Sequence, residues 1–176
     1  MRRGLCREFA VLRFQVWPLN VEHWPQGAGF EGVRKVRKLQ GEGRGTLVRI
    51  LVVDDNPAVR NYLRTLLEQQ STWQVVDEAR TGGEALQRVK KSPPDMILLD
   101  FQMPDLNGLD VARQISGIFP EIPILLVTIH LSKQLAEEAR RAGIRGACAK
   151  SDVGSIVEAV DALLHAGTYF PANVAV

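Results

Sequence analysis

Five short apolar runs constrain the fold of this chain of 176 residues more than any other feature of its sequence. They cover residues 48–53, 73–79, 96–100, 124–128 and 146–149. Apart from 73–79, which keeps a partly polar face, the runs show no alternation of polar and apolar residues. Continuous runs of this kind are typical of strands that are buried on both faces of a parallel sheet.

Segments with helical spacing of apolar residues follow these runs. The first segment begins with Asn56 as cap and Pro57 at the first helical position, and its apolar stripe ends at Leu67. The later helices are predicted from Thr81-Gly-Gly83 to Lys91, over 109–118, over 131–142 with Gly143 just past the end, and from Ser151 or Asp152 to Ala166 with Gly167 at the end.

Alternating strands and helices with short connections predict one domain, a doubly wound α/β fold with a five-stranded parallel sheet. We expect the strand order 2-1-3-4-5 and a flavodoxin-like three-layer sandwich. This order places the first and third strands side by side. The carboxylates that follow them, Asp54-Asp55 and Asp100, should then face one crevice, where ligands of open α/β sheets bind.

Polar residues stand at the ends of four of the predicted strands: Asp54-Asp55, Asp100, Thr128 and Lys150. Any one of them could be an ordinary loop residue, but four at one edge of a sheet are difficult to explain by capping. Three carboxylates within a few ångströms repel one another unless a cation neutralises them, and an all-oxygen site suits Mg²⁺. The sequence therefore predicts a magnesium site at this edge.

Asp100 is the candidate nucleophile of this site, because carboxylates attack phosphorus in enzymes that form an aspartyl phosphate. Mg²⁺ and the ammonium group of Lys150 would supply the positive charge that phosphoryl transfer requires, and the Thr128 hydroxyl would donate to a third oxygen. An ordinary salt bridge between Lys150 and Asp100 is the simpler interpretation of the lysine, and it is compatible with this one.

These motifs resemble the receiver domain of bacterial two-component response regulators over residues 48 to about 170. The match consists of DD after the first strand, D-x-x-M-P from Asp100, T at 128 and K at 150. The resemblance implies that Asp100 accepts a phosphoryl group from a sensor histidine kinase or a phosphotransfer protein. It also implies that Asp55 and Asp100 ligate Mg²⁺ directly with the Gln102 carbonyl, that Asp54 binds it largely through water, and that Thr128 and Lys150 contact the phosphoryl group.

Lys150-Ser151 and Gly167-Thr-Tyr-Phe170 resemble the subfamily that usually carries a helix-turn-helix output domain. The chain departs from this pattern in three places. It ends at Val176, where that output domain would begin. Ala147 stands where many receivers have a switch aromatic, and Ile129 stands where they usually have a small residue. We expect a stand-alone receiver that signals by binding partners, with a non-switching, constitutive interaction module as the alternative and homodimer formation left open.

Residues 1–47 are predicted to be a disordered tail that precedes the receiver domain at 48–170, and 171–176 a short C-terminal tail. The first 47 residues hold seven of the fifteen glycines, and nine Lys/Arg against four Asp/Glu. Such a composition does not support a packed element, although a mis-set start codon would also explain it. Contacts between the basic cluster at 34–38 and DNA or RNA are a further alternative.

Two other classes of function are considered from the sequence. A nucleotide- or flavin-binding domain could share this architecture, but the chain lacks a glycine-rich phosphate loop after its first strand. Secreted and membrane proteins are not favoured, because the N-terminus has neither a signal peptide nor a spanning helix. Cys6 and Cys148 show no metal spacing and are expected to be free thiols in the cytoplasm.

Overall fold

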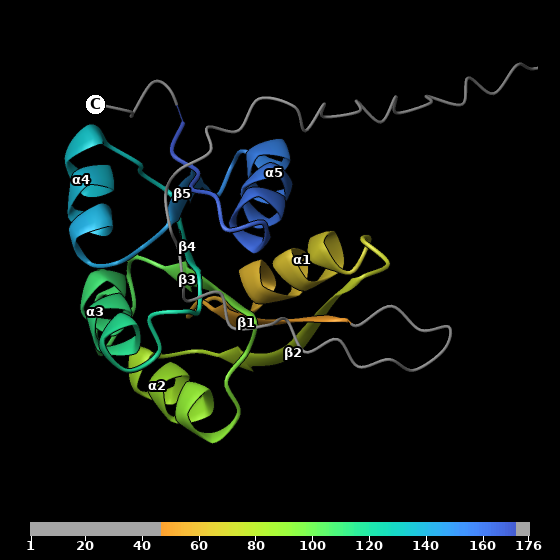
Figure 1. Cartoon of the computed structure of the whole chain (residues 1–176), viewed down its shortest axis with the longest axis horizontal. Helices are drawn as coiled ribbons and strands as arrows, with labels where there is room; N and C mark the ends of the chain where they lie inside the picture. The colour runs from red at the N-terminus through yellow and green to blue at the C-terminus, as the bar shows by residue number, and fades with distance from the viewer. Residues whose placement is uncertain (1–46, 172–176) are drawn as a thin grey trace, which may run out of the picture. The chain divides into compact units, whose positions relative to one another are not determined.

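The computed structural model describes residues 47–171, which form a five-stranded parallel sheet with helices on both faces (Figure 1). Most of the predicted tails, and Cys6, lie outside these residues. The strands are β1 (Val48–Val53), β2 (Trp73–Ala79), β3 (Met96–Asp100), β4 (Ile124–Thr128) and β5 (Gly146–Ala149). The helices are α1 (Pro57–Leu67), α2 (Gly82–Lys91), α3 (Gly108–Ile118), α4 (Lys133–Arg141) and α5 (Val153–Leu164).

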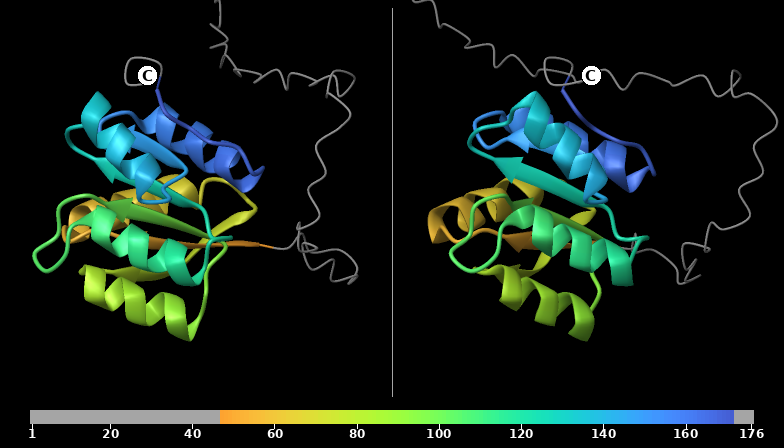
Figure 2. Two further views of the ribbon diagram at one scale, coloured as in Figure 1. Left: turned by 60° about the vertical axis from the view of Figure 1, so that its left-hand side comes forward. Right: turned by 90° about the vertical axis from the view of Figure 1, so that its left-hand side faces the viewer.

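The strand order is β2-β1-β3-β4-β5, as the sequence predicts, and every neighbouring pair is parallel. Helices α1 and α5 cover one face of the sheet, and α2, α3 and α4 cover the other (Figures 1 and 2). Every residue of β3 and β4 is buried. The central strands therefore lack polar alternation because both of their faces lie in the core.

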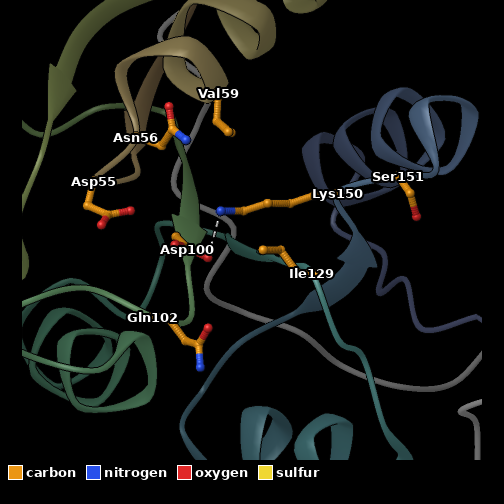
Figure 3. A pocket seen from close by; sticks show the side chains of 8 residues that line it. All are labelled: Asp55, Asn56, Val59, Asp100, Gln102, Ile129, Lys150 and Ser151. Atoms are coloured by element: carbon orange, nitrogen blue, oxygen red, sulfur yellow. Dashed lines mark ion pairs between the residues drawn. The ribbon is translucent and has the colours of Figure 1, made fainter.

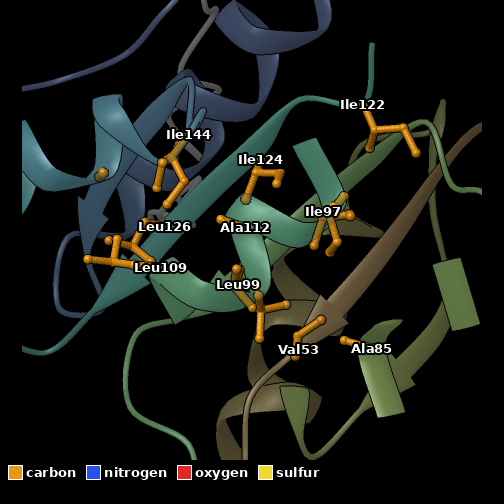
Figure 4. Packing of buried hydrophobic residues seen from close by; sticks show 14 of the residues in the cluster. Val53, Ala85, Ile97, Leu99, Leu109, Ala112, Ile122, Ile124, Leu126 and Ile144 are labelled. Atoms are coloured by element: carbon orange, nitrogen blue, oxygen red, sulfur yellow. The ribbon is translucent and has the colours of Figure 1, made fainter. Parts of the chain in front are cut away.

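Apolar side chains form one packed cluster on each face of the sheet. Figure 4 shows part of the cluster under α2, α3 and α4, where Leu99 and Val53 from the central strands lie close to Ala85 of α2 and to the α3 residues Leu109 and Ala112. This core fixes the ends of β1 and β3 next to each other, since Val53 pairs with Leu99. The residues that follow these two strands must then lie together.

Each helix begins at a polar cap residue whose side chain accepts a hydrogen bond from a main-chain N–H of the first turn: Asn56, Thr81, Asn107, Ser132 and Asp152. The cap explains one wrong prediction. Helix α4 was expected to begin at residue 131, but the Ser132 hydroxyl accepts from the Leu135 N–H at 3.1 Å, and the helix begins at Lys133. The predicted glycine after this helix is confirmed, because Gly143 has a φ of +84°.

Helix α5 ends at Leu164, two residues before the predicted end, and Ala166 takes a left-handed conformation with a φ of +60°. The chain then turns back toward the sheet. Tyr169 forms a parallel bridge beside Gly146 and accepts from the Ala147 N–H at 2.8 Å, so it covers the outer edge of β5. No helix within residues 47–171 has the length and apolarity that a membrane span requires.

Candidate functional site

An open cleft of about 500 Å³ lies at the carboxyl edge of the sheet, where β1, β3 and β4 end. Figure 3 shows its lining side chains: Asp55, Asn56, Val59, Asp100, Gln102, Ile129, Lys150 and Ser151. They come from the loops after the strands and from the start of α1. The cleft is therefore at the crevice that the strand order predicts.

Asp54, Asp55 and Asp100 meet in this cleft, with one carboxylate oxygen of each within 4.8 Å of the others. Asp54 and Asp100 are only 1% and 5% exposed, whereas Asp55 is exposed to solvent. The pairing of β1 with β3 produces this arrangement, because the carboxylates directly follow or end the two strands. The predicted grouping of the three carboxylates is observed.

Lys150 reaches into the cleft from the turn after β5 and forms ion pairs with two of these carboxylates, of which Figure 3 shows the one with Asp100. Its Nζ atom lies 2.6 Å from Asp54 Oδ2 and 3.1 Å from Asp100 Oδ1, and only 15% of its side chain is exposed. The expected salt bridge between Lys150 and Asp100 is thus present, but Lys150 also pairs with Asp54, and the contact with Asp54 is the shorter of the two.

Burial and ion pairing act in opposite directions on the pKa values of Asp100 and Lys150. For Asp100, burial raises the pKa, and the contact with Lys150 lowers it only in part. For Lys150, burial lowers the pKa, but its hydrogen bonds to Asp54 and Asp100 outweigh that effect and the pKa is raised. Lys150 therefore stays charged. The single ammonium group is shared between two of the three clustered carboxylates, so the cluster keeps an excess of carboxylates over ammonium groups.

The donor set fits a hard divalent cation such as Mg²⁺, which prefers carboxylate, carbonyl and water oxygens. Asp55 and Gln102 are both exposed and line the cleft, so there is room for water beside them. The side chain of Gln102 points away from Asp55 in Figure 3. Both oxygens of Asp54 are already engaged, one by Lys150 and the other by the Asn56 N–H at 2.9 Å.

Thr128 ends β4 and is buried, but it is not among the residues that line the cleft. Its main-chain oxygen accepts from the Lys150 N–H at 2.8 Å, so it helps to fix the turn that carries the lysine. Ile129, the next residue, lines the cleft and is 63% exposed. Ala147 is fully buried in the core beside α4.

Two residues that the sequence does not single out organise the loops of the cleft. Arg60 of α1 donates hydrogen bonds to the main-chain oxygens of Asp54 and Asp55. Asp105 follows β3 and accepts from the N–H groups of Gly82 and Gly83 at 2.9 and 2.8 Å, which ties the loop to the start of α2. The Asp105 contacts span more than 20 residues of sequence. The Arg60 contacts are local, but the orientation of Arg60 depends on its ion pair with Glu78, 18 residues away. Residue type and local spacing give no signal for either arrangement.

The loop between β3 and α3 is also fixed at its α3 end, where its main chain packs closely against the end of β3. The Gly108 N–H donates to Phe101 O at 2.8 Å, and a Cβ at Gly108 would collide with the main-chain oxygen of Asp100. Only glycine fits this approach. The backbone around Asp100 and Gln102 is therefore held at both ends of the loop.

Comparison with known proteins identifies the family of this fold and site. Residues 50–161 match the response regulator receiver domain. The chain belongs to the response regulator receiver family. The family resemblance inferred from the motifs is thereby confirmed, as is the doubly wound fold with the strand order of receiver domains.

Curated and structural relatives agree with this assignment. A putative transcriptional regulator from Pseudomonas aeruginosa is 32% identical over 124 residues, which are 70% of this chain and 59% of that protein. The transcriptional regulatory protein DegU from Brevibacillus brevis is 27% identical over 128 residues, 72% of this chain and 54% of that protein. The chain thus spans little more than half the length of these curated relatives.

Among solved structures, a two-component response regulator of the LuxR family from Aurantimonas sp. SI85-9A1 is 32% identical. It aligns with a TM-score of 0.70 over 73% of this chain and 93% of that one. A receiver domain is a phosphoacceptor signalling module of two-component systems, and it works with a histidine kinase or another phosphodonor. The carboxylate cluster of this receiver fits a bound metal ion.

Proposed function

We propose that this receiver accepts a phosphoryl group on Asp100 from a sensor histidine kinase or a phosphotransfer protein, in a reaction that depends on Mg²⁺, and that it signals by binding a protein partner. One observation carries the proposal. Asp100 lies buried in the open cleft, 3.1 Å from the ammonium group of Lys150 and beside two further carboxylates. This arrangement supports the proposal, because it puts a candidate nucleophile beside a positive charge and a carboxylate cluster that fits a cation.

In the proposed reaction a carboxylate oxygen of Asp100 forms a bond to phosphorus while the bond from phosphorus to the donor breaks. The donor leaves with the electron pair of that bond. Lys150 already stands beside Asp100 and would contact one oxygen of the incoming group, and the Thr128 hydroxyl would donate to another from the end of β4. Mg²⁺, when bound, would neutralise the negative charge that the phosphoryl oxygens and the carboxylates share.

Asp55 and Asp100, with the Gln102 carbonyl, are the proposed direct ligands of Mg²⁺. Asp54 is proposed to bind largely through water. The engagement of both Asp54 oxygens by Lys150 and the Asn56 N–H supports this division, because they are less free to ligate a metal than those of the exposed Asp55.

A second candidate function is a constitutive interaction module that does not switch. Ala147 favours it, because the buried position in β5 has no ring that could move when Thr128 moves. Ile129 favours it as well, since a bulky apolar side chain lines the cleft that holds Asp100. A ligand shifts a conformational equilibrium only as far as it binds the two states differently.

Beryllofluoride, a mimic of the phosphoryl group, tests both candidates in one amide NMR experiment. With Mg²⁺ we expect shifts at the residues of the cleft, a modest change concentrated at 128–133, and little change along 146–149. The Asp100→Asn variant and a sample with chelator should show none of these shifts. Absence of binding to the wild type would contradict phosphorylation of Asp100. Shifts that stay within the cleft and spare 130–133 would favour the non-switching module.

A further inference from the structure

Arg60 connects α1 to the loop that carries Asp54 and Asp55. It is the fourth residue of α1, and its side chain extends toward the start of the helix, as long helical side chains usually do. Its Nη1 atom donates to Asp54 O at 2.8 Å and to Asp55 O at 3.2 Å. Only 17% of the side chain is exposed. One guanidinium group thus binds the main-chain oxygens of the two consecutive residues that supply two of the three clustered carboxylates.

Glu78 of β2 holds Arg60 in this position. The Arg60 Nε atom donates to Glu78 Oε2 at 3.0 Å, and the other carboxylate oxygen accepts from Arg64 Nε at 2.8 Å. Although burial alone would raise the pKa of Glu78, the hydrogen bonds from Arg64 and Arg60 outweigh it and the pKa is lowered. Glu78 therefore stays ionised and anchors both guanidinium groups.

A guanidinium group suits this position better than an ammonium group. It is planar and offers five N–H donors in fixed directions, so it can bind a carboxylate along one edge and carbonyl oxygens along another. The loop is held from its other side as well, since the Asp54 N–H donates to Ala79 O at 3.0 Å. The main chain at Asp54 and Asp55 is fixed, while the Asp55 side chain stays exposed to the cleft.

We infer that Arg60 is a positioning residue for the divalent cation. It acts through Asp54 and Asp55, because it fixes their main chain so that the Asp55 carboxylate faces the cleft before any cation binds. A metal-binding side chain that is already ordered loses less conformational freedom when the cation binds. Residues that orient metal-binding side chains typically contribute a 10- to 100-fold gain in the affinity for the metal. This inference rests on the proposed Mg²⁺ site and deepens it.

Arg64 provides a matched control for the test. It shares Glu78 with Arg60, but its remaining hydrogen bonds go to Val75 O and to Glu68, and none goes to the loop of the cleft. If the ion pairs of Arg60 and Arg64 with Glu78 serve only to join α1 to β2, loss of either arginine should have the same effect on Mg²⁺ binding. If Arg60 positions the cation site, only its loss should weaken Mg²⁺ binding.

The experiment titrates Mg²⁺ into the full chain and its variants, with amide NMR shifts as the readout and circular dichroism as a check on folding. Arg60→Met should weaken Mg²⁺ binding by roughly 10-fold, whereas Arg64→Met should change it by less than about twofold although both lower the melting temperature. Arg60→Lys should recover part of the affinity and serves as the second variant if Arg60→Met does not fold. Wild-type affinity in both Arg60 variants, or an equal loss in Arg64→Met, would overturn the inference.

Amide hydrogen exchange without Mg²⁺ separates this inference from the proposed function. The Asn56 N–H donates to Asp54 Oδ1 and reports the order of the loop. It should exchange faster in Arg60→Met than in the wild type and in Arg64→Met. Unchanged exchange would overturn the positioning role even if Mg²⁺ binds. A wild type that binds no Mg²⁺ would contradict the proposed function, while the exchange rates would still decide whether Arg60 orders the loop.

Discussion

At the scale of single residues, burial determines how the chemically active side chains behave. Lys150 is charged in a half-buried position because two carboxylates pair with it. Loss of either carboxylate would leave Lys150 paired with the other, so its charge stays compensated as long as Asp54 or Asp100 remains. Burial also acts on Cys148, where no cation opposes it and the pKa of the thiol is raised.

Cys148 of β5 is predicted to resist thiol reagents as long as the protein is folded. It is fully buried, and burial raises the pKa of its thiol to about 12. At pH 8 the folded thiol keeps its proton, and reaction requires the thiolate. In a Cys6→Ser variant, which leaves Cys148 as the only thiol, reaction with an aromatic disulfide reagent should be at least roughly 100-fold slower in buffer than in urea.

The raised pKa also sets the sign of the pH dependence. The unfolded thiol loses its proton near pH 9 whereas the folded one keeps it to about 12, so the folded state should lose stability as the pH rises above about 9.

Rapid labelling of Cys148 in the folded Cys6→Ser variant at pH 8 would show that β5 opens readily, which would contradict the burial of this strand in the core.

At the scale of elements, the sequence predicts the strands better than the helix ends. All five strands agree with the predicted runs. Four of them are buried and almost continuously apolar, and the edge strand β2 keeps the partly polar face seen in its sequence. Helix α4 begins later than predicted because Ser132 is its N-terminal cap and not part of its first turn. Helix α5 ends earlier than predicted because Ala166 has a left-handed backbone conformation, which ends the helix. A run of apolar residues does not reveal either event.

The segment after α5 is predicted to stabilise the β5 edge. Phe170 packs against the cluster on the α4 side of the sheet, and the Arg140 guanidinium carbon lies 3.9 Å from the centre of its ring. Phe170→Ala should lower the free energy of unfolding by about 1–2 kcal/mol, less than the 3–5 of a fully buried Phe because the ring is only partly buried. Urea unfolding measures this change, with the exposed Thr168→Ala as the control.

Equal stability of the two variants would show that Phe170 contributes nothing to the fold.

At the scale of the whole molecule, the candidate site is a product of topology. Asp54, Asp55, Asp100 and Lys150 could be predicted from the sequence because each follows or ends a strand, and the strand order brings their side chains together. Arg60 could not, since its partner Glu78 lies 18 residues away and their contact depends on how α1 packs on β2. Strand ends can be located along the chain, whereas contacts between elements require the packed fold.

The position of the phosphoryl group tests the central claim most directly. The full chain is treated with acetyl phosphate and Mg²⁺ and then with borohydride, which reduces a phosphorylated aspartate to homoserine, and mass spectrometry locates the changed residue. We expect homoserine at position 100 alone, none in the presence of a metal chelator, and none in Asp100→Asn. Homoserine at position 54 or 55, or an equal yield without Mg²⁺, would contradict a metal-dependent phosphoacceptor at Asp100.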